Sequence, residues 1–533
     1  MAPAFAVADP ESDPGATYAL EPAEVRALTA RLRASSGTST TTRAPATGAL
    51  LASVPLSSPE DVAAAAVEAR EAQRDWARTP VRERAALVLR LADCMLAERS
   101  EVLDLVQLES GKARLHAFEE VVDLASLARH LAVRGPRYLA PRREPGLVPG
   151  LTSVRVHHRP VGLVGVVTPW NYPLNLPLGD TLQALLAGNA VLLKPDTQTV
   201  LTALWGVARL EEAGLPAGLV HVVAGGPEVG AAVVDAVDHV AFTGSTATGR
   251  KVAEAAARRL VPVTLELGGK NALYVAEDVD VETAAEGAVR ACFVGAGQVC
   301  VSVERLYVHE AVAERFTEAF VRRVRALRLG FSLDYRHDVG SLTTEAQLEK
   351  VLAHLDDAVG RGARVLAGGV HRTDLGPLFF EPTVLADLPE DAVCAREETF
   401  GPLVALRTVA SDAEAVARMN DTEMGLSASI WTASERRGRA LAAQVRSGMV
   451  NVNEGYAAAW SAYGAPAGGW GASGIGARHG REGLLATTRT QTVAAQRLAH
   501  RGLGLRRVYE LPGERTAEVL TAALRVLRAL RMP

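Results

Sequence analysis

From Val161 onward the chain repeats one pattern that leaves few folds open. Short runs rich in β-branched residues alternate with stretches rich in alanine and leucine. The runs lie at 161–167, 190–193, 219–223, 239–242 and 263–267. Antiparallel neighbours can be connected by a short hairpin turn, whereas parallel neighbours need a long crossover connection, usually a helix. Strands that alternate with helical stretches therefore indicate parallel pairing. We therefore predict a parallel, doubly wound α/β sheet that ends near Leu267.

A second series of the same kind follows the first. Its expected strands lie at 273–275, 305–309, 364–367, 403–406 and 427–431. The fold class is therefore predicted as α/β, with two doubly wound α/β domains in tandem. The 533 residues are long enough to build both. Residues 58–108 carry the serine, proline and acidic starts and the alanine-rich runs that are typical of helices.

Composition excludes several classes of protein. Hydrophobic residues make up 48% of the chain and charged residues 22%, and the net charge is −4. A nucleic-acid-binding protein needs a basic stripe, and the sequence has none, so we expect no nucleic-acid partner. No apolar run reaches the roughly 20 residues that span a bilayer, and the first residues do not resemble a secretory signal. Four scattered cysteines do not make a disulfide framework, which favours a cytoplasmic location.

Both ends of the chain stand apart from this pattern. Residues 1–45 are rich in Ala, Pro, Ser and Thr, and we predict a flexible N-terminal segment. Residues 501–533 hold seven arginines against three glutamates, and a basic helix is predicted after Pro512. Its apolar side chains share one face, formed by Val519, Leu520, Ala523, Leu524, Leu527 and Leu530. We expect this face to pack on the chain itself or on a sister subunit, with a peripheral membrane contact as the alternative.

Three motifs could carry chemistry, and each has a purely structural alternative. In Pro169-Trp170-Asn171-Tyr172-Pro173, two prolines around an amide fix either an oxyanion donor or a structural turn. Glu266 lies between leucines at the end of an apolar strand, where burial would suit it as a general base. The alternative is an ion pair with Lys270. Cys300 follows Gly297-Gln298-Val299 and is a candidate nucleophile, whereas the other three cysteines are interpreted as packing residues.

Two glycine patterns follow predicted strands. The first is Gly225-Gly226-Pro-Glu-Val-Gly230, and the second runs from Phe242 through Gly244 and Ser245 to Gly249. In the second pattern a strand ends at Gly244 and a helix begins at Ser245. Free main-chain N–H groups and a hydroxyl could hold a phosphate there, although Ser245 could equally serve only as an N-cap. No metal site is predicted, because the sequence lacks the usual His and Cys spacings.

Taken together, the motifs resemble in order and spacing those of the NAD(P)-dependent aldehyde dehydrogenase superfamily. They are Asn171, Lys194-Pro195, 242–249, 266–269, 297–300, 397–402 and the closing glycine-rich GGWGASGIG at 468–476. The resemblance covers roughly residues 40–495. The stretches ATTRTQTVAAQRL and NVNEGYAAAW are closest to bacterial proteins labelled succinate-semialdehyde dehydrogenase.

The resemblance implies that an aldehyde is oxidised to a carboxylic acid with NAD or NADP. Cys300 would attack the aldehyde to give a thiohemiacetal and then a thioester, with the oxyanion held by the Asn171 side chain and the Cys300 N–H. Glu266 would activate the water that hydrolyses the thioester. Lys194 and Glu398 would hold the two riboses, Ser245 the pyrophosphate, and Phe400 would lie against the nicotinamide. The full set implied for cofactor binding is Pro169, Trp170, Lys194, Thr197, Gly226, Gly230, Phe242, Gly244, Ser245, Leu267, Gly268, Glu398 and Phe400.

Several positions depart from the family's pattern. Thr197 stands where a glutamate would exclude a 2′-phosphate, so use of both cofactors is expected. Gly179 and Val294 stand where well-understood succinate-semialdehyde enzymes carry arginines, although Arg446 could reach the pocket instead. We therefore expect medium-chain or aromatic aldehydes, with succinate semialdehyde as the alternative. The expected substrate residues are Tyr172, Gly179, Val299, Val301, Tyr456, Trp460 and Ala467.

The family's architecture implies a division of the chain into domains. Residues 46–140 and 160–267 would form the cofactor-binding domain, and 268–463 the catalytic domain. A β-hairpin arm, 141–159 with 484–497, would pair subunits into a homodimer or homotetramer. Residues 464–483 would form a glycine-rich closing segment. A non-catalytic dinucleotide-binding scaffold and a thiol esterase are rival interpretations, but the first would not need both Cys300 and Glu266, and the second would need no cofactor motifs.

Overall fold

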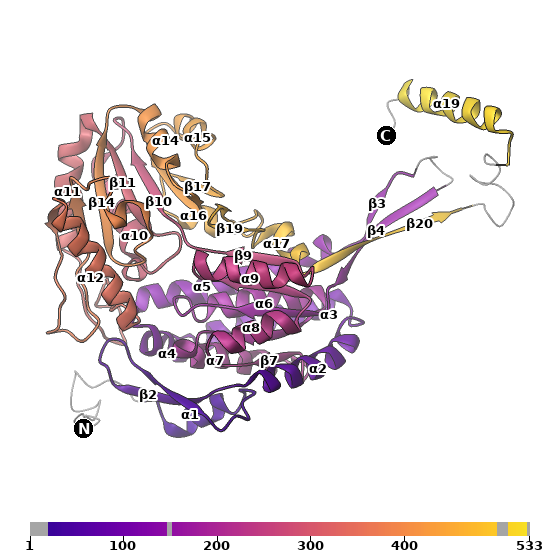
Figure 1. The fold of residues 1–533 in the computed structure, drawn as a ribbon, viewed down its shortest axis with the longest axis horizontal. Coiled ribbons are helices and arrows are strands. Elements are labelled where there is room, and N and C mark those ends of the chain that lie inside the picture. Colours follow the sequence, from indigo (N-terminus) through magenta and orange to yellow (C-terminus); the bar gives the residue numbers. More distant parts are fainter. Residues whose placement is uncertain (1–19, 147–151, 498–509, 530–533) are drawn as a thin grey trace.

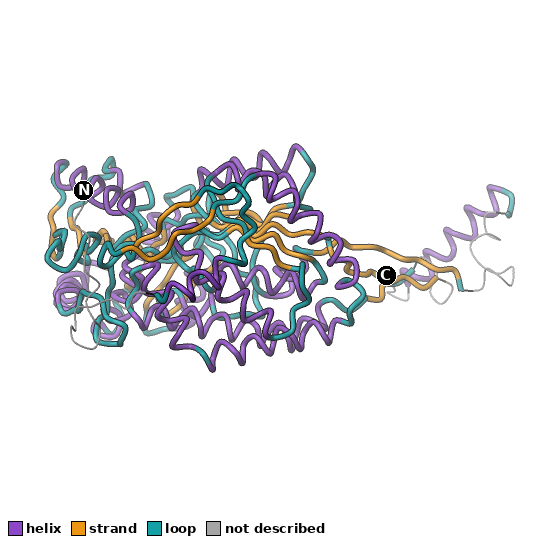
Figure 2. Tube along the Cα trace, turned by 90° about the horizontal axis from the view of Figure 1, so that it is seen from below, coloured by secondary structure: helices purple, strands orange, loops and turns teal. Residues whose placement is uncertain are grey.

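The computed structural model describes residues 20–146, 152–497 and 510–529. Two parallel sheets with helices on their faces form the body, and a narrow three-stranded sheet extends from it (Figure 1). The body is layered, with helices on both sides of the strands (Figure 2). The prediction of two doubly wound α/β domains is confirmed.

The first sheet has the order β19-β9-β8-β5-β6-β7. Its strands are β5 (Leu163–Val167), β6 (Ala190–Lys194), β7 (Val220–Val222), β8 (His239–Thr243), β9 (Val263–Glu266) and β19 (Gly474–Ile475). The five predicted runs form the parallel part, and β19 adds an antiparallel edge. The chain winds away from β5 in both directions, and ligands of doubly wound sheets bind beyond the carboxyl ends of the strands at such a point.

Helices cover both faces of this sheet. One layer contains α2 (Pro59–Trp76), α8 (Pro227–Ala236) and α9 (Thr246–Arg258). The other contains α3 (Val81–Ala97), α4 (Arg99–Ser110), α5 (Arg114–Tyr138), α6 (Asn175–Ala187) and α7 (Val200–Glu212). All of α6 is buried, since it lies between the strands and α3 with α5. This continuous apolar core fixes the carboxyl ends of β5, β8 and β9.

The second sheet has the order β12-β13-β14-β11-β10-β16-β17. Its strands are β10 (Asn271–Val275), β11 (Val303–His309), β12 (Arg364–Ala367), β13 (Thr383–Ala386), β14 (Leu403–Val409), β16 (Ser427–Trp431) and β17 (Met449–Val452). All pairs are parallel except β12 with β13. The sequence did not predict β13 and β17, which have four residues each. The accompanying helices are α10 (Val281–Phe293), α11 (Ala313–Arg325), α12 (Glu345–Gly360), α13 (Val393–Arg396), α14 (Asp412–Asn420), α15 (Glu435–Ala442) and α16 (Ala457–Trp460).

The glycine-rich segment at 464–483 connects the two sheets. Strand β18 (Trp470–Gly471) pairs with β15 (Met424–Gly425), beside the second sheet, and β19 pairs with β9 in the first. Gly474 has a φ of 153°, and a Cβ there would lie 2.1 Å from the Leu265 carbonyl oxygen. Glycine is required because the two main chains approach so closely. The short helix α17 (Gly480–Ala486) follows.

The extended sheet consists of β3 (Arg142–Glu144), β4 (Thr152–Pro160) and β20 (Thr488–Gln496), all antiparallel. His157 and His158 lie on β4 opposite Gln491 and Thr490. The C-terminal strand of the predicted arm begins at Thr488 rather than at 484, because α17 occupies the preceding residues.

The prediction of a flexible segment at 1–45 is wrong for its described part. Residues 22–29 form α1 (Pro22–Thr29), and β1 (Ser39–Arg43) pairs with β2 (Leu50–Pro55). Leu32 is buried and bridges to Val222. The composition suggested a linker, but the run of threonines is β-branched and suits an antiparallel ladder. Residues 1–19 lie outside the described residues.

The predicted basic helix is present as α19 (Gly513–Ala529). Its described residues do not pack on the chain itself, and packing on a sister subunit stays a prediction. None of its described residues is buried, and Val519 and Leu524 are 46% and 56% exposed. Amphipathic spacing predicts a helix and its apolar face, but not what that face contacts. Leu530 lies outside the described residues. None of the helices in the described ranges has the length and apolarity that crossing a bilayer requires.

Candidate active site

A cavity of about 480 Å³ opens where β5, β8 and β9 end, facing the second sheet. Residues of α5, α6, α12 and α16 line it together with the loops that follow these strands. It therefore lies where ligands of a doubly wound sheet bind. Most of the predicted site residues line this cavity: Pro169, Trp170, Asn171, Tyr172, Gly244, Ser245, Leu267, Gly268, Val299, Cys300, Val301, Glu398, Phe400, Tyr456 and Trp460.

Cys300 lies at the end of a tightly constrained loop. Gly295, Ala296 and Gly297 have φ values of 57°, 56° and 72°, three successive left-handed residues. A Cβ at Gly297 would lie 2.2 Å from the Gly401 carbonyl oxygen, so only glycine fits there. The Cys300 carbonyl oxygen accepts a hydrogen bond of 2.7 Å from Asn271 Nδ2. The main chain around the thiol is thus held from two sides.

Burial, together with the nearby Glu266 and Glu398 carboxylates, raises the pKa of the Cys300 thiol to about 12. At neutral pH the thiol is therefore protonated in this state of the protein. A proton acceptor is needed before the sulfur can act as a nucleophile.

Asn171 follows β5 and is buried. Its Nδ2 donates a hydrogen bond of 2.9 Å to the main-chain oxygen of Gln298, two residues before the thiol. An Asx-turn would use the side-chain oxygen instead, and within the described residues Asn171 Oδ1 has no partner. The structure thus ties this amide to the loop that carries Cys300.

Glu266 is the last residue of β9 and is buried. Burial raises the pKa of its carboxyl to about 8, and Arg478 partly opposes the shift. Its Oε1 has no partner within the described residues. The alternative of an ion pair with Lys270 is wrong, because Lys270 Nζ lies 2.5 Å from Glu304 Oε2.

Arg478 is a buried residue that the sequence did not single out. It donates to Asp180 Oδ2 at 2.6 Å and to the Thr243 hydroxyl. Its positive charge acts on both Glu266 and Cys300. The arginine follows the glycine-rich segment, and no local pattern links it to residues more than 200 positions earlier.

Glu398 and Phe400 form the opposite wall. Glu398 Oε1 accepts a hydrogen bond of 2.8 Å from the Gly269 N–H, and burial raises the pKa of its carboxyl to about 7. Phe400 has a φ of 58° and lies edge-on to Trp170, with 5.7 Å between the ring centroids. Glu304 holds this segment in place, since its carboxylate accepts the N–H groups of Thr399 and Phe400.

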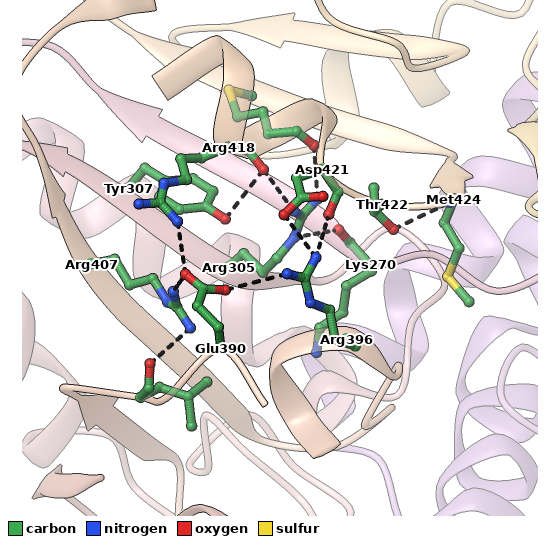
Figure 3. A network of polar contacts seen from close by, with 12 residues as sticks. Lys270, Arg305, Tyr307, Glu390, Arg396, Arg407, Arg418, Asp421, Thr422 and Met424 are labelled. Atoms are coloured by element: carbon green, nitrogen blue, oxygen red, sulfur yellow. Dashed lines mark hydrogen bonds and ion pairs between the residues drawn. The ribbon is translucent and has the colours of Figure 1, made fainter. Parts of the chain in front are cut away.

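A polar network behind this wall fixes the segment that follows Gly268 and Gly269. The Arg305 guanidinium donates to the Lys270 carbonyl oxygen at 2.9 Å and to those of Arg418 and Met419 at 3.0 Å (Figure 3). Glu390 joins the side chains of Arg396, Arg407 and Arg418 in the same network (Figure 3). The network ties β11 to the end of α14.

The residues implied for the distal part of the cofactor lie outside this cavity. Lys194, at the end of β6, has no ion-pair or hydrogen-bond partner in the described parts of the chain, and burial lowers its pKa. A Cβ at Gly230 would lie 3.7 Å from the Lys194 side chain, whereas a Cβ at Gly226 would meet nothing within 4 Å. Thr197 begins a short 3-10 turn (Thr197–Thr199) that Asp196 caps. An unpaired lysine beside open space fits the hydroxyls of a dinucleotide.

Ser245 is the N-cap of α9, because its hydroxyl accepts the Thr248 N–H at 3.3 Å. It also lines the cavity, so the capping role and the phosphate role are compatible. Phe242 is buried in the core and does not line the cavity; its ring lies 2.7 Å from where a Cβ of Gly244 would stand. Phe242 therefore shapes the Gly244 turn from behind.

The side of the cavity that carries the predicted substrate residues is aromatic and acidic. Tyr172, Tyr456, Trp460 and Tyr463 line it together with Phe118, Glu119, Val122 and Asp123 of α5. Gly179 and Ala467 do not line it. A Cβ at Gly179 would lie 3.6 Å from Asn175 Oδ1, and Ala467 packs behind Val299 and Val301. Arg446 is exposed and lines another surface pocket. The described residues contain no group of three His, Cys, Asp or Glu side chains placed to hold a metal.

Comparison with known proteins gives the family. The model described as "Aldehyde dehydrogenase family" matches residues 32–493. The chain belongs to the aldehyde dehydrogenase family. It is an oxidoreductase that acts on aldehydes and uses NAD or NADP. The predicted family resemblance is therefore confirmed.

Two curated relatives of this aldehyde dehydrogenase illustrate the range of names. A Mycolicibacterium smegmatis protein named "Putative succinate-semialdehyde dehydrogenase (NADP+)" is 50% identical over 453 residues, 85% of this chain and 88% of the relative. A Methylomonas sp protein named "4,4'-diapolycopene aldehyde oxidase" is 37% identical over 451 residues, 83% of each chain.

Solved structures agree with the fold. An E. coli NADP-dependent enzyme superimposes with a TM-score of 0.83 at 34% identity, covering 87% of this chain and 96% of that one. The NAD-dependent aldehyde dehydrogenase of Sinorhizobium meliloti gives a TM-score of 0.83 at 33% identity, covering 87% and 92%.

Proposed function

We propose that this aldehyde dehydrogenase converts aldehydes to carboxylic acids through a covalent intermediate on Cys300. One observation carries the proposal: the thiol and an amide tied to the thiol's loop line one cavity, and the buried Glu266 carboxyl, with a pKa of about 8, lies close enough to act on the thiol. These are the three groups that acyl chemistry on a thiol requires: a nucleophile, an oxyanion donor and a base.

The first half of the reaction forms the C–S bond. Water takes up the Cys300 proton as the sulfur bonds to the aldehyde carbon to give a thiohemiacetal. The negative charge on oxygen is held by the Cys300 N–H and by the Asn171 Nδ2 hydrogen that Gln298 does not use. NAD or NADP, when bound, would supply the acceptor for the hydride that leaves the thiohemiacetal carbon, and Cys300 would then carry a thioester.

The second half is hydrolysis. Glu266 takes a proton from water as the water oxygen bonds to the thioester carbon. The C–S bond then breaks, and the acid and the thiol are released. A carboxyl whose pKa lies near the working pH is suited to both giving up and accepting a proton in this cycle.

We propose that the cofactor would be held between the ends of the strands of the first sheet and the wall formed by Glu398 and Phe400. Lys194 and Glu398 would hold its riboses, Ser245 its pyrophosphate, and Phe400 with Trp170 its nicotinamide end. Thr197 carries no charge that would repel a 2′-phosphate, so both NAD and NADP are expected to work.

For the substrate, we propose medium-chain or aromatic aldehydes. The names of the relatives favour succinate semialdehyde as the second candidate. However, no arginine lines the described cavity, and a buried carboxylate without a cationic partner is costly. A panel of aldehydes, assayed with both cofactors on the wild type and Cys300→Ala, tests the proposal. Preference for succinate semialdehyde by orders of magnitude would contradict the substrate assignment, and activity of the alanine variant would contradict the mechanism.

The extended sheet supports a homodimer or homotetramer. Strand β20 is exposed over nearly its whole length, and Val493 is 44% exposed. A bare three-stranded sheet with apolar side chains in water gains stability by pairing with another copy. Light scattering that gave the mass of a single chain would contradict this assembly. The four unpaired cysteines support a reducing, cytoplasmic location.

A further inference from the structure

The substrate side of the cavity carries two carboxylates that the reaction does not use. Glu119 and Asp123 lie one turn apart on α5 and both line the cavity. Among the described lining residues the one cationic side chain is Lys350, which acts on Glu398 at the cofactor side. The entrance through which the aldehyde reaches Cys300 is thus acidic.

The two carboxylates differ in how they are bonded. Both oxygens of Asp123 have donors, because it accepts hydrogen bonds from the Trp460 Nε1–H at 3.0 Å, from the Tyr463 hydroxyl and from the Asn175 amide. Glu119 accepts one hydrogen bond, at 3.2 Å from the Tyr456 hydroxyl to Oε2. Its Oε1 has no donor within the described residues. Asp123 therefore fixes the aromatic wall, whereas Glu119 presents an open acceptor.

The free acceptor oxygen is a feature of Glu119 and not of its neighbour Glu120. Glu120 is fully buried, lies 2.5 Å from Lys112 Nζ, and accepts the main-chain N–H groups that begin α6. Glu120 thereby pairs with Lys112, whose charge also acts on Glu119 and whose ammonium lies 3.7 Å from the Tyr172 ring centroid. The Tyr172 ring thus already makes a cation–π contact on one face.

We propose that this entrance selects aldehydes that carry a positively charged amine on the carbon chain, with Glu119 as the specificity-determining residue. The inference rests on the proposed function and names a narrower substrate class for the same site. An ammonium group near Glu119 gains an ion pair, and the rings of Tyr456, Trp460 and Tyr463 add cation–π attraction. A carboxylate at the same place is repelled, which sets the site against succinate semialdehyde.

Isosteric substrate pairs separate charge from size. 3-Aminopropanal and butanal differ only in an ammonium replacing a methyl group, and 3-hydroxypropanal adds a neutral hydrogen-bond donor. 4-(Trimethylammonio)butanal and 5,5-dimethylhexanal form a second pair in which the cation has no N–H. We expect kcat/KM for each cation to exceed that of its neutral isostere by about ten-fold or more, and succinate semialdehyde to be the poorest.

Glu119→Gln should lower the ratio of kcat/KM for 3-aminopropanal to that for butanal by about ten-fold, whereas Glu71→Gln, on the exposed face of α2, should keep it. The ratio cancels any general loss of active protein. Inhibition of the wild type by tetramethylammonium, competitive with butanal, is an independent measurement. A preference for the hydroxyl or neutral member, or a ratio unchanged in Glu119→Gln, overturns the inference. Failure to oxidise any of the aldehydes would instead overturn the proposed function.

Discussion

Lys270 and Glu304 form a buried ion pair, with 2.5 Å between Nζ and Oε2, directly behind the candidate active site. The same Glu304 carboxylate accepts the N–H groups of Thr399 and Phe400. One buried charge pair thus connects the turn after β9 to the wall formed by Glu398 and Phe400. The pair positions the wall formed by Glu398 and Phe400, and neither of its two residues lines the cavity.

Replacing Lys270 should therefore damage both stability and cofactor binding. Lys270→Met leaves Glu304 as a buried carboxylate without its cation, which costs about 3–5 kcal/mol of unfolding free energy. Denaturant unfolding checks the stability, and the cofactor dissociation constant checks the wall. Lys251→Met, at an exposed position of α9, is the matched control and should change neither. Equal unfolding midpoints for the two variants would contradict the role of the pair.

Removing the Asn171 amide should slow the chemistry rather than weaken cofactor binding. Asn171→Ala removes one of two oxyanion donors, and kcat should fall by about 10²–10³. The cofactor dissociation constant should stay within about two-fold, because the side chain bonds to the Gln298 carbonyl oxygen and not to the cofactor cradle. A variant with wild-type kcat would show that the amide serves only to hold the loop.

Glu266 should make the steady-state rate rise with pH in a limb that reflects ionisation of its carboxyl. The pKa of its carboxyl is raised to about 8, so the group is mostly protonated at pH 7 and becomes an effective base as the pH rises. We expect kcat to increase with pH and to level off above about pH 8. In Glu266→Gln this limb should disappear, whereas a single burst of reduced cofactor should remain because the thioester still forms. The decisive readout is rapid mixing over a pH series. A variant without a burst would contradict this account, because Glu266 would then be needed before the thioester forms.

The cofactor preference should depend on Thr197. The wild type should use both cofactors, and Thr197→Glu should lower kcat/KM with NADP by about ten-fold or more relative to NAD, because the new carboxylate repels a 2′-phosphate. Steady-state assays with each cofactor measure the two ratios. A wild-type preference for NAD above about 100-fold would contradict this account of position 197.

Much of the fold was predictable because the spacing of the apolar runs and the sequence motifs indicate the same strands and helices. The strands of the first sheet are apolar, bounded by glycine and proline, and separated by helical stretches, so their parallel order follows from connection length alone. Asn171, Glu266 and Ser245 each follow such a strand, and carboxyl ends of parallel strands meet at one edge. Strands β13 and β17 were missed, although β9 and β12 are equally short and were predicted.

The acidic side of the cavity could not be predicted, because neighbouring residues with the same chemistry have different partners. Glu119 and Glu120 are adjacent in the sequence, yet one lines the cavity and the other pairs with Lys112. Only the packing of α5 against α6 and α16 separates them. Arg478 was missed for the same reason, since Asp180 lies 298 positions earlier. Contacts of this range leave no local signal in a single sequence.

The central claim is that the Cys300 sulfur forms the covalent intermediate. Its most direct test is the initial rate of NAD(P)H formation by folded, cofactor-loaded Cys300→Ala on butanal and benzaldehyde. Cys94→Ala, on α3 and away from the cavity, is the matched control. The account predicts a loss of more than about 10³-fold for Cys300→Ala and a normal rate for the control. An undiminished rate in the Cys300→Ala protein would contradict the account.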